Sequence, residues 1–319
     1  MFYLLCLLVS SWISSTSALA FDVSSKSLGF YGLGTMGEHM AGHLHKLAEE
    51  GGGKVRVASR DTEKARRWAD ARGAIHCDSF DELSKECDVV CMCLSTTDVV
   101  EEVLRKCDFL KAGQLLIDCT SGEPERMKVL GEKLSSQGVK LVDSPVSGGP
   151  AGAKAGTLTS MLGGSVSDVA DAMKVVDAWS GKSVRCGDIG SGDAVKAINN
   201  VLNTAHVLLA AEASLVLQKY GVDASIALDV INSSSGRSLQ TERLPATVLS
   251  RSFDFGFALA LMRKDVVIAD QLVQKFAPTH TLIPEVKRLI IDAEKKVGGD
   301  ADYTEVARLL EERVGEELC

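Results

Sequence analysis

The sequence predicts an α/β fold in which an N-terminal, doubly wound parallel sheet is followed by an all-helical C-terminal domain. Three observations support this prediction. Short apolar runs alternate with amphipathic segments from residue 27 to about residue 187, a glycine-rich turn follows the first run, and strand signals nearly vanish after Gly187. Strands that alternate with helices at this spacing form a parallel sheet with helices on both faces.

The first half contains five apolar runs that are short enough to be strands. They are residues 27–31, 54–59, 88–94, 115–119 and 139–142. Helical periodicity marks residues 36–50 and 63–72, and Gly51-Gly52-Gly53 separates the first of these helices from the second strand. Because each strand has a helical segment before or after it, the sheet is expected to be parallel.

The second half has helical periodicity throughout. The expected helices are residues 194–220, 224–231, 259–276, 285–296 and about 304–316. A boundary near Gly190-Ser191-Gly192 would divide the chain into a sheet domain, residues 27–188, and a helical domain, residues 190–319.

Composition favours small-molecule chemistry. The chain has 319 residues and a formal net charge of −8. A nucleic-acid surface needs clustered Lys and Arg, and acidic and basic residues are interspersed here, so no nucleic-acid partner is expected. The nine cysteines include no CxxC pair and no His/Cys cluster with metal-ligand spacing. We therefore expect reduced thiols, largely buried in apolar runs, and no metal site.

The first 20 residues read as a targeting segment. Met1 to Ile13 is strongly apolar, and a Ser/Thr-rich stretch then leads to Ala18-Leu19-Ala20. This resembles a signal peptide with a small-x-small cleavage site, although a positively charged n-region is missing. It predicts entry into the secretory pathway, with an organelle such as a plastid as one destination. The alternative is a misassigned start or an unprocessed tail. No later segment is expected to span a bilayer, so we expect no stable membrane association after processing.

The first strand and first helix are joined by Gly32-Leu33-Gly34-Thr35-Met36-Gly37. In this G-x-G-x-x-G pattern the first glycine permits a tight turn, the second lets a pyrophosphate approach the backbone, and the third lets the helix pack on the strand. Backbone N–H groups at the helix start then bind the phosphates. The order strand, turn, helix predicts a Rossmann-type dinucleotide site with all six residues as cofactor contacts.

The end of the second strand distinguishes the two nicotinamide dinucleotides. An acidic residue at this point binds the ribose 2′-OH of NAD, whereas this chain has Ser59-Arg60. Arg60 can pair with a 2′-phosphate and Ser59 can donate a hydrogen bond to it. Asp61 comes one position late but can still turn inward. NADP is therefore the favoured cofactor and NAD the alternative.

Lys196 and Asn200 stand four residues apart at the start of the long helix of the second half. At this spacing their side chains project from one face. A lysine and an amide on an otherwise apolar helix need solvent or a polar cavity, and taken alone they would more often lie at the surface. Beside a nucleotide site they could hold an oxygen that gains or loses a proton.

Two further motifs lie between these features. The segment Asp118-Cys119-Thr120-Ser121-Gly122-Glu123-Pro124 follows the fourth strand, and Asp143-Ser144-Pro145-Val146-Ser147-Gly148-Gly149 follows the fifth. Together with the glycine turn and the Lys196 helix, and in the same order, they resemble the β-hydroxyacid dehydrogenase family, which includes 3-hydroxyisobutyrate dehydrogenase and glyoxylate/succinic semialdehyde reductase. The resemblance covers about residues 27 to 315.

The resemblance implies roles for individual residues. Lys196 would be the catalytic acid/base, and Asn200 would help to hold the substrate. The N–H groups of Ser147, Gly148 and Gly149 would bind the substrate carboxylate, which fits the physics because consecutive small residues expose backbone donors that bind anions. Taken alone, this loop could also be a simple turn.

Further residues would belong to the cofactor and substrate sites. Ser121 would lie beside the nicotinamide, where the family usually has threonine. Phe257 and Asp265 would line the substrate pocket. Lys264 would contact the nicotinamide side. Leu94 and Ser95, at the end of the third strand, would also bind the cofactor. The alternative for the later segment is a core phenylalanine followed by a surface charge pair.

The resemblance implies an NAD(P)-dependent oxidoreductase of the 3-hydroxyisobutyrate dehydrogenase type, which transfers hydride reversibly between a small 3-hydroxy acid and its semialdehyde. An NADPH-dependent reductase of glyoxylate or succinic semialdehyde is an alternative. A decarboxylating enzyme of the 6-phosphogluconate type fits less well because the chain lacks a long helical extension. A catalytically silent dinucleotide-binding relative is the alternative outside enzymes. The substrate would carry a carboxylate, and the protein would form a homodimer or homotetramer.

Overall fold

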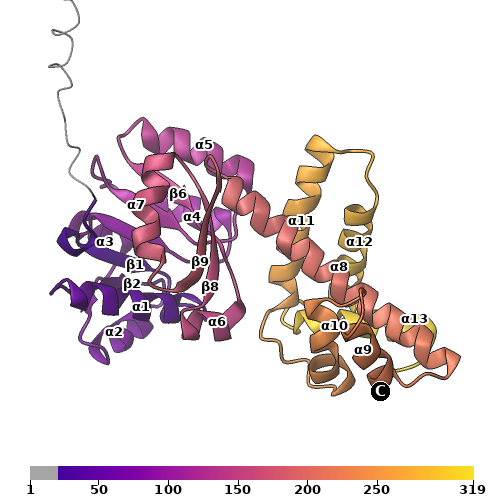
Figure 1. Cartoon of the computed structure of the whole chain (residues 1–319). Coiled ribbons are helices and arrows are strands. Elements are labelled where there is room, and N and C mark those ends of the chain that lie inside the picture. Colours follow the sequence, from indigo (N-terminus) through magenta and orange to yellow (C-terminus); the bar gives the residue numbers. More distant parts are fainter. Residues whose placement is uncertain (1–20) are drawn as a thin grey trace, which may run out of the picture.

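The computed structural model describes residues 21–319, and the predicted targeting segment, residues 1–20, lies outside them. One half of the molecule is a sheet flanked by helices, and the other half is helical (Figure 1). The predicted fold class is confirmed.

The sheet has nine strands, and its first six form a parallel array in the order β3-β2-β1-β4-β5-β6. This is the doubly wound order in which a ligand binds beyond the carboxyl ends of the strands, where the winding reverses between β1 and β4. The strands are β1 (Leu28–Tyr31), β2 (Arg56–Ala58), β3 (Ile75–His76), β4 (Val89–Met92), β5 (Leu115–Asp118) and β6 (Lys140–Asp143). The register pairs Tyr31 with Met92 and Asp118 with Asp143, so the strand ends lie level with one another.

The far edge of the sheet differs from the expected all-parallel arrangement. It consists of β7 (Val146–Ser147), β8 (Leu158–Gly163) and β9 (Ser180–Gly187). Strand β8 runs antiparallel to both β6 and β7 and parallel to β9. No strand was expected here. Strand β7 has two residues, and β9 has a polar sequence in which no residue is fully buried, so neither gives an apolar run.

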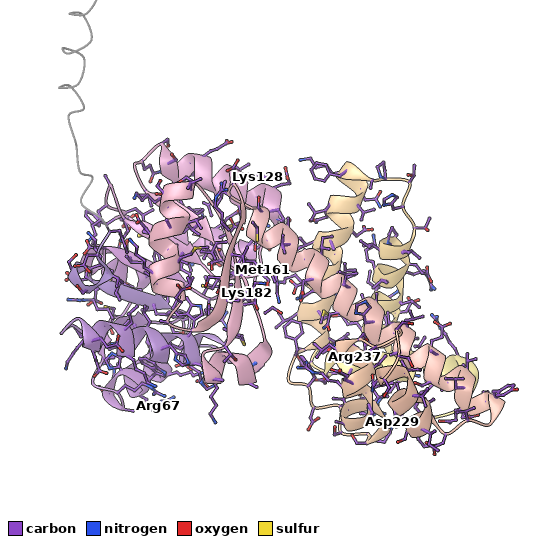
Figure 2. The ribbon with its side chains drawn as sticks, in the orientation of Figure 1. Arg67, Lys128, Met161, Lys182, Asp229 and Arg237 are labelled. Carbon is purple, nitrogen blue, oxygen red and sulfur yellow. The ribbon has the colours of Figure 1, made fainter. Side chains whose placement is uncertain are left out.

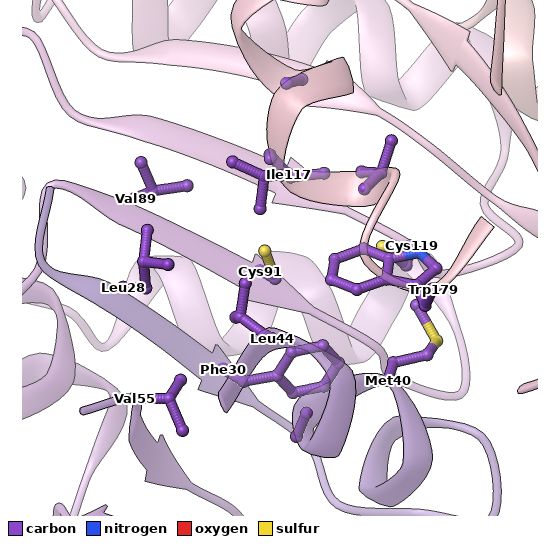
Figure 3. Close-up of a cluster of buried hydrophobic side chains, with 14 of the residues drawn as sticks. Leu28, Phe30, Met40, Leu44, Val55, Val89, Cys91, Ile117, Cys119 and Trp179 are labelled. Atoms are coloured by element: carbon purple, nitrogen blue, oxygen red, sulfur yellow. The ribbon is translucent and has the colours of Figure 1, made fainter. Parts of the chain in front are cut away.

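Helices cover both faces of the sheet, each with its own apolar layer. One layer packs α1 (Gly37–Glu50), α2 (Thr62–Asp70) and α7 (Val166–Val176) on the sheet, and Figure 3 shows Phe30 and Trp179 in it, edge to face at 6.2 Å. The other layer packs α3 (Phe80–Glu86), α4 (Thr97–Arg105) and α5 (Pro124–Ser135). Strand residues alternate between them, because successive side chains of a strand point to opposite faces.

The helical half is built around α8 (Ser191–Tyr220), a helix of 30 residues that starts against the sheet (Figure 1). Gly192 permits this approach, since a Cβ there would lie 2.1 Å from the Met161 carbonyl oxygen, and Met161 lies where the two halves meet (Figure 2). The other elements are α6 (Gly149–Ala155) in the sheet half and α9 (Ala224–Asn232), α10 (Leu239–Leu244), the π-helical turn Pro245–Leu249, α11 (Leu259–Phe276), α12 (Leu282–Val297), the short helix Tyr303–Val306 and α13 (Ala307–Val314).

Helix α8 corrects one expectation, that no segment after residue 20 is long and apolar enough to span a bilayer. By length and composition alone it is apolar enough to cross a membrane, and it is the one such helix in residues 21–319. Half of its most apolar window is buried inside the protein, where it packs in the core of the helical half. Core helices commonly have this composition. Among the described residues the eight cysteines are free, and four of them are buried: Cys77, Cys87, Cys91 and Cys119.

Candidate active site

The glycine turn lies at the end of β1, and its three glycines differ in what a side chain at each would meet. Gly32 has a φ of 102°, and a Cβ there would lie 2.4 Å from the Cys93 carbonyl oxygen. A Cβ on Gly37 would lie 1.9 Å from the Gly32 carbonyl oxygen, so α1 packs against the turn itself. Gly34 is exposed, and a Cβ there would meet nothing within 4 Å. The backbone at Gly34 is therefore open to a ligand.

The N–H groups of the turn are available to such a ligand. Glu38 is the first residue after the turn whose N–H bonds back into it, to the Gly34 carbonyl at 3.0 Å. In residues 21–319, the N–H groups of Leu33, Gly34, Thr35 and Met36 have no hydrogen-bond acceptor. Unpaired donors at a helix N-terminus form an anion site. The turn therefore fits the pyrophosphate of a dinucleotide.

The end of β2 presents Arg60 and engages Asp61. The Asp61 carboxylate caps α2 by accepting the Lys64 N–H at 2.9 Å. Arg60 is exposed and forms no ion pair within the described part of the chain, and Ser59 beside it is half-buried. An acidic group that already caps a helix is less available to a ribose hydroxyl. At the end of β2 the group available to the ribose of a dinucleotide is therefore the Arg60 guanidinium, and not the Asp61 carboxylate.

The ends of β4 and β5 lie beside the turn. Leu94 donates its N–H to Thr120 Oγ1 at 3.0 Å, and its side chain packs so close to Gly32 that a Cβ there would lie 2.9 Å from it. Lys264 of α11 reaches this edge and donates from Nζ to the carbonyls of Ser121 and of Ser95, the latter at 3.2 Å. Helix α11 is thereby connected to both strand ends.

A cavity of about 340 Å³ opens between α11 and these strand ends. Ser121 and Lys264 line it together with Thr96, Thr97 and Glu123 from the sheet half, and Leu261, Arg263 and Gln271 from α11. It therefore adjoins two residues that the sequence analysis assigned to the nicotinamide side.

A polar cluster joins α8 to α11. Asn200 donates from Nδ2 to Asp265 Oδ2 at 2.5 Å, and Asp265 Oδ1 lies 3.2 Å from Lys264 Nζ. Asn200 and Asp265 are buried, with 4% and 2% of their surfaces exposed. These side chains are packed in the protein, so the pairing of Lys264 and Asp265 is not a surface charge pair.

Lys196 is half-buried one helical turn before Asn200. Burial lowers the pKa of Lys196, the nearby Asp265 carboxylate opposes that shift, and the Lys264 ammonium adds to it. Among the described residues, Lys196 has no hydrogen-bonded or ion-paired partner of its own. A lysine with a lowered pKa and a free ammonium suits proton transfer to a ligand.

The predicted carboxylate loop lies where β7 ends and α6 begins. Gly148 has a φ of 134° and Gly149 a φ of 65°, both in the region that favours glycine. Phe257 lies on the facing part of the helical half, since a Cβ on the preceding Gly256 would lie 4.0 Å from Pro150 Cγ. Its half-buried ring packs edge to face on Tyr303 at 6.3 Å. The backbone just before Phe257 thus lies close to the start of α6, which follows the loop.

Comparison with known proteins agrees with this architecture. Residues 27–187 match the family model described as the NAD binding domain of 6-phosphogluconate dehydrogenase. Residues 190–310 match the model described as NAD-binding of NADP-dependent 3-hydroxyisobutyrate dehydrogenase. The chain belongs to the β-hydroxyacid dehydrogenase family.

Individual members of the β-hydroxyacid dehydrogenase family align over most of the chain. The mitochondrial 3-hydroxyisobutyrate dehydrogenase of Drosophila melanogaster is 29% identical over 95% of both chains. The 2-(hydroxymethyl)glutarate dehydrogenase of Eubacterium barkeri is 35% identical over 77% of this chain and 81% of its own. A solved 3-hydroxyisobutyrate dehydrogenase of Mycobacterium tuberculosis with L-serine is 29% identical, covers 89% of this chain and 99% of its own, and has a TM-score of 0.81.

Sequence reasoning missed three buried carboxyl groups beneath the site of this β-hydroxyacid dehydrogenase. Asp118, Asp143 and Asp193 are each at most 1% exposed. The first two lie in the quoted motifs, but no role was assigned to them. Asp193 precedes Lys196 by three residues, a spacing that places both on one side of α8 and could have identified it.

Proposed function

We propose that the protein transfers hydride reversibly between a nicotinamide dinucleotide, preferably NADP, and a small 3-hydroxy acid, whose hydroxyl-bearing carbon becomes the carbonyl of a semialdehyde. Relatives of this family are named for 3-hydroxyisobutyrate and 2-(hydroxymethyl)glutarate. Both names denote carboxylic acids that bear a hydroxyl group.

One observation carries the proposal. Asn200, one helical turn after Lys196 on α8, is connected through Asp265 and Lys264 to the carbonyls of Ser95 and Ser121, at the strand ends next to the glycine turn. These contacts hold the part of α8 that carries Lys196 against the strand edge where this fold binds its dinucleotide.

Lys196 would move the proton that accompanies hydride transfer. When the carbonyl is reduced, its ammonium donates a proton to the forming alkoxide and stabilises the developing negative charge before transfer. In the oxidation direction the neutral amine accepts the hydroxyl proton. The bound nicotinamide would supply or take up the hydride.

Asn200 and the loop of residues 147–149 would orient the substrate. Asn200 is held by its bond to Asp265, so its amide keeps one position. Backbone N–H groups at Ser147, Gly148 and Gly149 would bind the carboxylate, with the loop held between β7 and α6. Fixing the carboxylate limits the positions that the reacting carbon can take.

The test is a panel of 3-hydroxy acids and semialdehydes, glyoxylate included, assayed in both directions with NADP(H) and NAD(H). We expect turnover of at least one 3-hydroxy acid, preferentially with NADP. Lys196→Met should lower kcat by about 10²- to 10⁴-fold and leave cofactor binding intact. Near-normal turnover in that variant would refute the assignment of Lys196. Absence of activity on the whole panel would favour a silent dinucleotide-binding protein.

The protein would act as a homodimer or larger homo-oligomer. Four exposed apolar residues of α8 recur every seven positions, Val195, Leu202, Leu209 and Val216, with 44%, 52%, 64% and 63% of their surfaces exposed. A heptad-spaced apolar stripe is the pattern by which one helix packs on a second copy of itself. We call these four residues the α8 stripe.

Sedimentation of a Leu202→Glu/Leu209→Glu variant tests this assembly. The wild type should sediment as a dimer or larger species, and the double variant should shift toward the monomer. Val129→Glu is the matched control, because Val129 is 66% exposed and lies on α5, so it is not part of the α8 stripe. A monomeric wild type, or an unchanged double variant, would refute this interface.

Residues 1–20 would direct the protein into the secretory pathway, from their apolar run and the Ala18-Leu19-Ala20 site. A fluorescent protein fused after residue 30 should enter that pathway or a derived organelle. The same fusion without residues 1–20 should remain in the cytosol. Identical distributions of the two would argue for an unprocessed tail.

A further inference from the structure

We propose that Asp193 is a positioning residue for the hydride transfer proposed above: as a protonated carboxyl, it holds the nicotinamide-side loop of residues 120–123 against the turn of α8 that carries Lys196. The inference rests on the proposed function for its kinetic part. Its structural part rests on the contacts of Asp193 alone.

The loop is held by hydrogen bonds from separate elements. Asp193 Oδ1 accepts the Gly122 N–H at 2.8 Å, and Thr97 Oγ1 of α4 accepts the Glu123 N–H at 2.8 Å. Lys264 of α11 donates to the Ser121 carbonyl. Of these three contacts, only that of Asp193 comes from the helix that bears the acid/base lysine.

The approach of Asp193 to the loop depends on a glycine. A Cβ on residue 122 would lie 2.9 Å from Asp193 Oδ2 and 3.2 Å from Thr97 Oγ1. The backbone of the loop therefore lies directly on the carboxyl group. A small displacement of Asp193 would move Ser121, whose neighbourhood is the proposed nicotinamide side, relative to Lys196.

Asp143 fixes the start of α8 from the sheet. Its Oδ1 accepts the Gly190 N–H at 2.7 Å, and its Oδ2 accepts the Asp193 N–H at 2.9 Å. These are donors that a helix N-terminus leaves free, so Asp143 acts as a cap supplied by another element. Burial raises the pKa of Asp143, while the N–H donors of Gly190 and Asp193 and the helix dipole oppose that rise and favour its charged form.

The contacts of Asp193 favour its protonated carboxyl. It is 1% exposed, it accepts one N–H, and its Oδ2 is buried without a hydrogen-bond partner. The groups that face it are the carboxyls of Asp143 on β6 and Asp118 on β5, and the Lys264 ammonium on α11, while Cys186 on β9 lies near Asp143. Three buried carboxyls thus share one cation, which is already paired with Asp265.

The electrostatic surroundings of Asp193 also favour its protonated form. Burial raises the pKa of Asp193 well above its ordinary value, and the Asp143 and Asp118 charges raise it further. Asp193 Oδ1 still accepts from Gly122 when Oδ2 carries a proton. Ionisation would place a second charge beside Asp143, and repulsion would then act directly on the contact that holds the loop.

Asp193→Asn and Asp193→Ala test the proposal, with Asp188→Asn as control. The amide of Asp193→Asn preserves the acceptor but cannot ionise. Asp188 lies just before α8, and its side chain is 93% exposed. We measure kcat for hydroxy-acid oxidation against pH, NADPH binding by its fluorescence, and Tm from pH 5 to pH 9 without substrate.

In the wild type we expect kcat for oxidation first to rise with pH as Lys196 loses its proton. At higher pH kcat should then fall as Asp193 ionises. Asp193→Asn should keep the rise and lose the fall. Asp193→Ala should lower kcat on the order of tenfold at every pH, with NADPH affinity within about threefold. The Tm of Asp193→Asn should rise relative to the wild type as pH increases, because folding of the wild type must take up a proton that its unfolded chain has released.

A high-pH fall that persists in Asp193→Asn overturns the proposal, as does a Tm difference that does not depend on pH. Asp193→Asn retains the shape of the side chain, so the test does not depend on Asp193→Ala folding. If the wild type turns over no substrate, the proposed function fails, and the Tm series still decides whether Asp193 holds the proton.

Discussion

Asn200 of α8 donates a hydrogen bond to Asp265 of α11 at 2.5 Å inside the helical half. The same carboxylate lies 3.2 Å from Lys264 Nζ, which bonds to the ends of two sheet strands. The substrate-side amide and the cofactor-side lysine therefore share one acid. Altering Asp265 should affect both halves of the site.

The charges around Lys196 predict opposite pH shifts for two variants. The Asp265 carboxylate raises the pKa of Lys196, and the Lys264 ammonium lowers it. Oxidation needs neutral Lys196, so kcat in that direction rises with pH through its pKa. Asp265→Asn should therefore move the rise to lower pH, and Lys264→Met should move it to higher pH. The pH profile of kcat measures both.

The reduction direction provides the internal control, because reduction needs protonated Lys196. In each variant kcat for reduction should fall with rising pH, around the same shifted pKa of Lys196. Shifts of the same sign in Asp265→Asn and Lys264→Met would contradict the assignment of Lys196 as the titrating group.

Alanine substitutions at two glycines of the same turn should affect different properties, NADPH affinity at Gly34 and stability at Gly37. At Gly34 a Cβ meets open space, so Gly34→Ala should keep the wild-type Tm but bind NADPH at least about tenfold more weakly, since the methyl group stands where phosphate approaches. At Gly37 a Cβ would meet the Gly32 carbonyl, so Gly37→Ala should lose about 1–3 kcal/mol or more of unfolding free energy.

Thermal unfolding and fluorescence titration of NADPH separate these two effects. Equal loss of Tm in both variants would mean that the turn is only a packing feature. Normal NADPH affinity in Gly34→Ala would show that no phosphate binds at this part of the backbone.

The sequence predicted the fold best where hydrophobic periodicity and local motifs coincide. Five of the six strands in the parallel array were expected, all but the two-residue β3, because those five are apolar runs; their order in the sheet was not predicted. Strands β8 and β9 were missed, since β9 is stabilised by its pairing with β8 and not by an apolar sequence. Pairing between distant segments leaves no local pattern.

The site shows the same limit. Lys196 and Asn200 are four residues apart and could be read from one helix. The role of Asp193 depends on Gly122, which is 71 residues away, and on Asp143, which is 50 residues away. A buried carboxyl whose partners come from other elements has no signature in its own segment, so its environment becomes visible only in three dimensions.

Arg60 should determine the preference for NADP. It is exposed at the end of β2 beside Asp61, which caps α2. Arg60→Ala should raise the KM for NADPH by about tenfold or more and leave that for NADH nearly unchanged, because only the former carries a 2′-phosphate. Steady-state kinetics with both cofactors measures this.

Lys182→Ala is the control for net charge, since Lys182 is exposed on β9, which the strand order puts at the opposite edge of the sheet from β3. It should leave both KM values unchanged. A wild-type preference for NADH would refute the role of Arg60 directly.

Asp118 should destabilise the fold at neutral and high pH. Burial raises the pKa of Asp118 from 3.8 to about 7, with a smaller contribution from Asp143. The folded state therefore binds a proton that the unfolded state has lost between about pH 4 and pH 7, and stability falls as pH rises through that window. Asp118→Asn keeps an acceptor for the Thr120 N–H and cannot ionise, so it should gain on the order of a few kcal/mol above pH 7.

Asp88→Asn provides a control of opposite sign. The Asp88 carboxylate accepts the Ser27 N–H at 3.0 Å and pairs with Lys111 at 3.1 Å, and these contacts lower its pKa despite partial burial. Its stabilising contribution is present above pH 4 and is lost as pH falls, so Asp88→Asn should reduce stability at pH 7 and lose this effect in acid. Urea unfolding at pH 2.5, 4, 6 and 8 should thus give differences of opposite sign for the two variants. The gain of Asp118→Asn should shrink from pH 8 toward pH 4, whereas the loss of Asp88→Asn should persist at pH 4 and shrink only below it. A pH-independent gain for Asp118→Asn would show that Asp118 is not protonated in the folded protein.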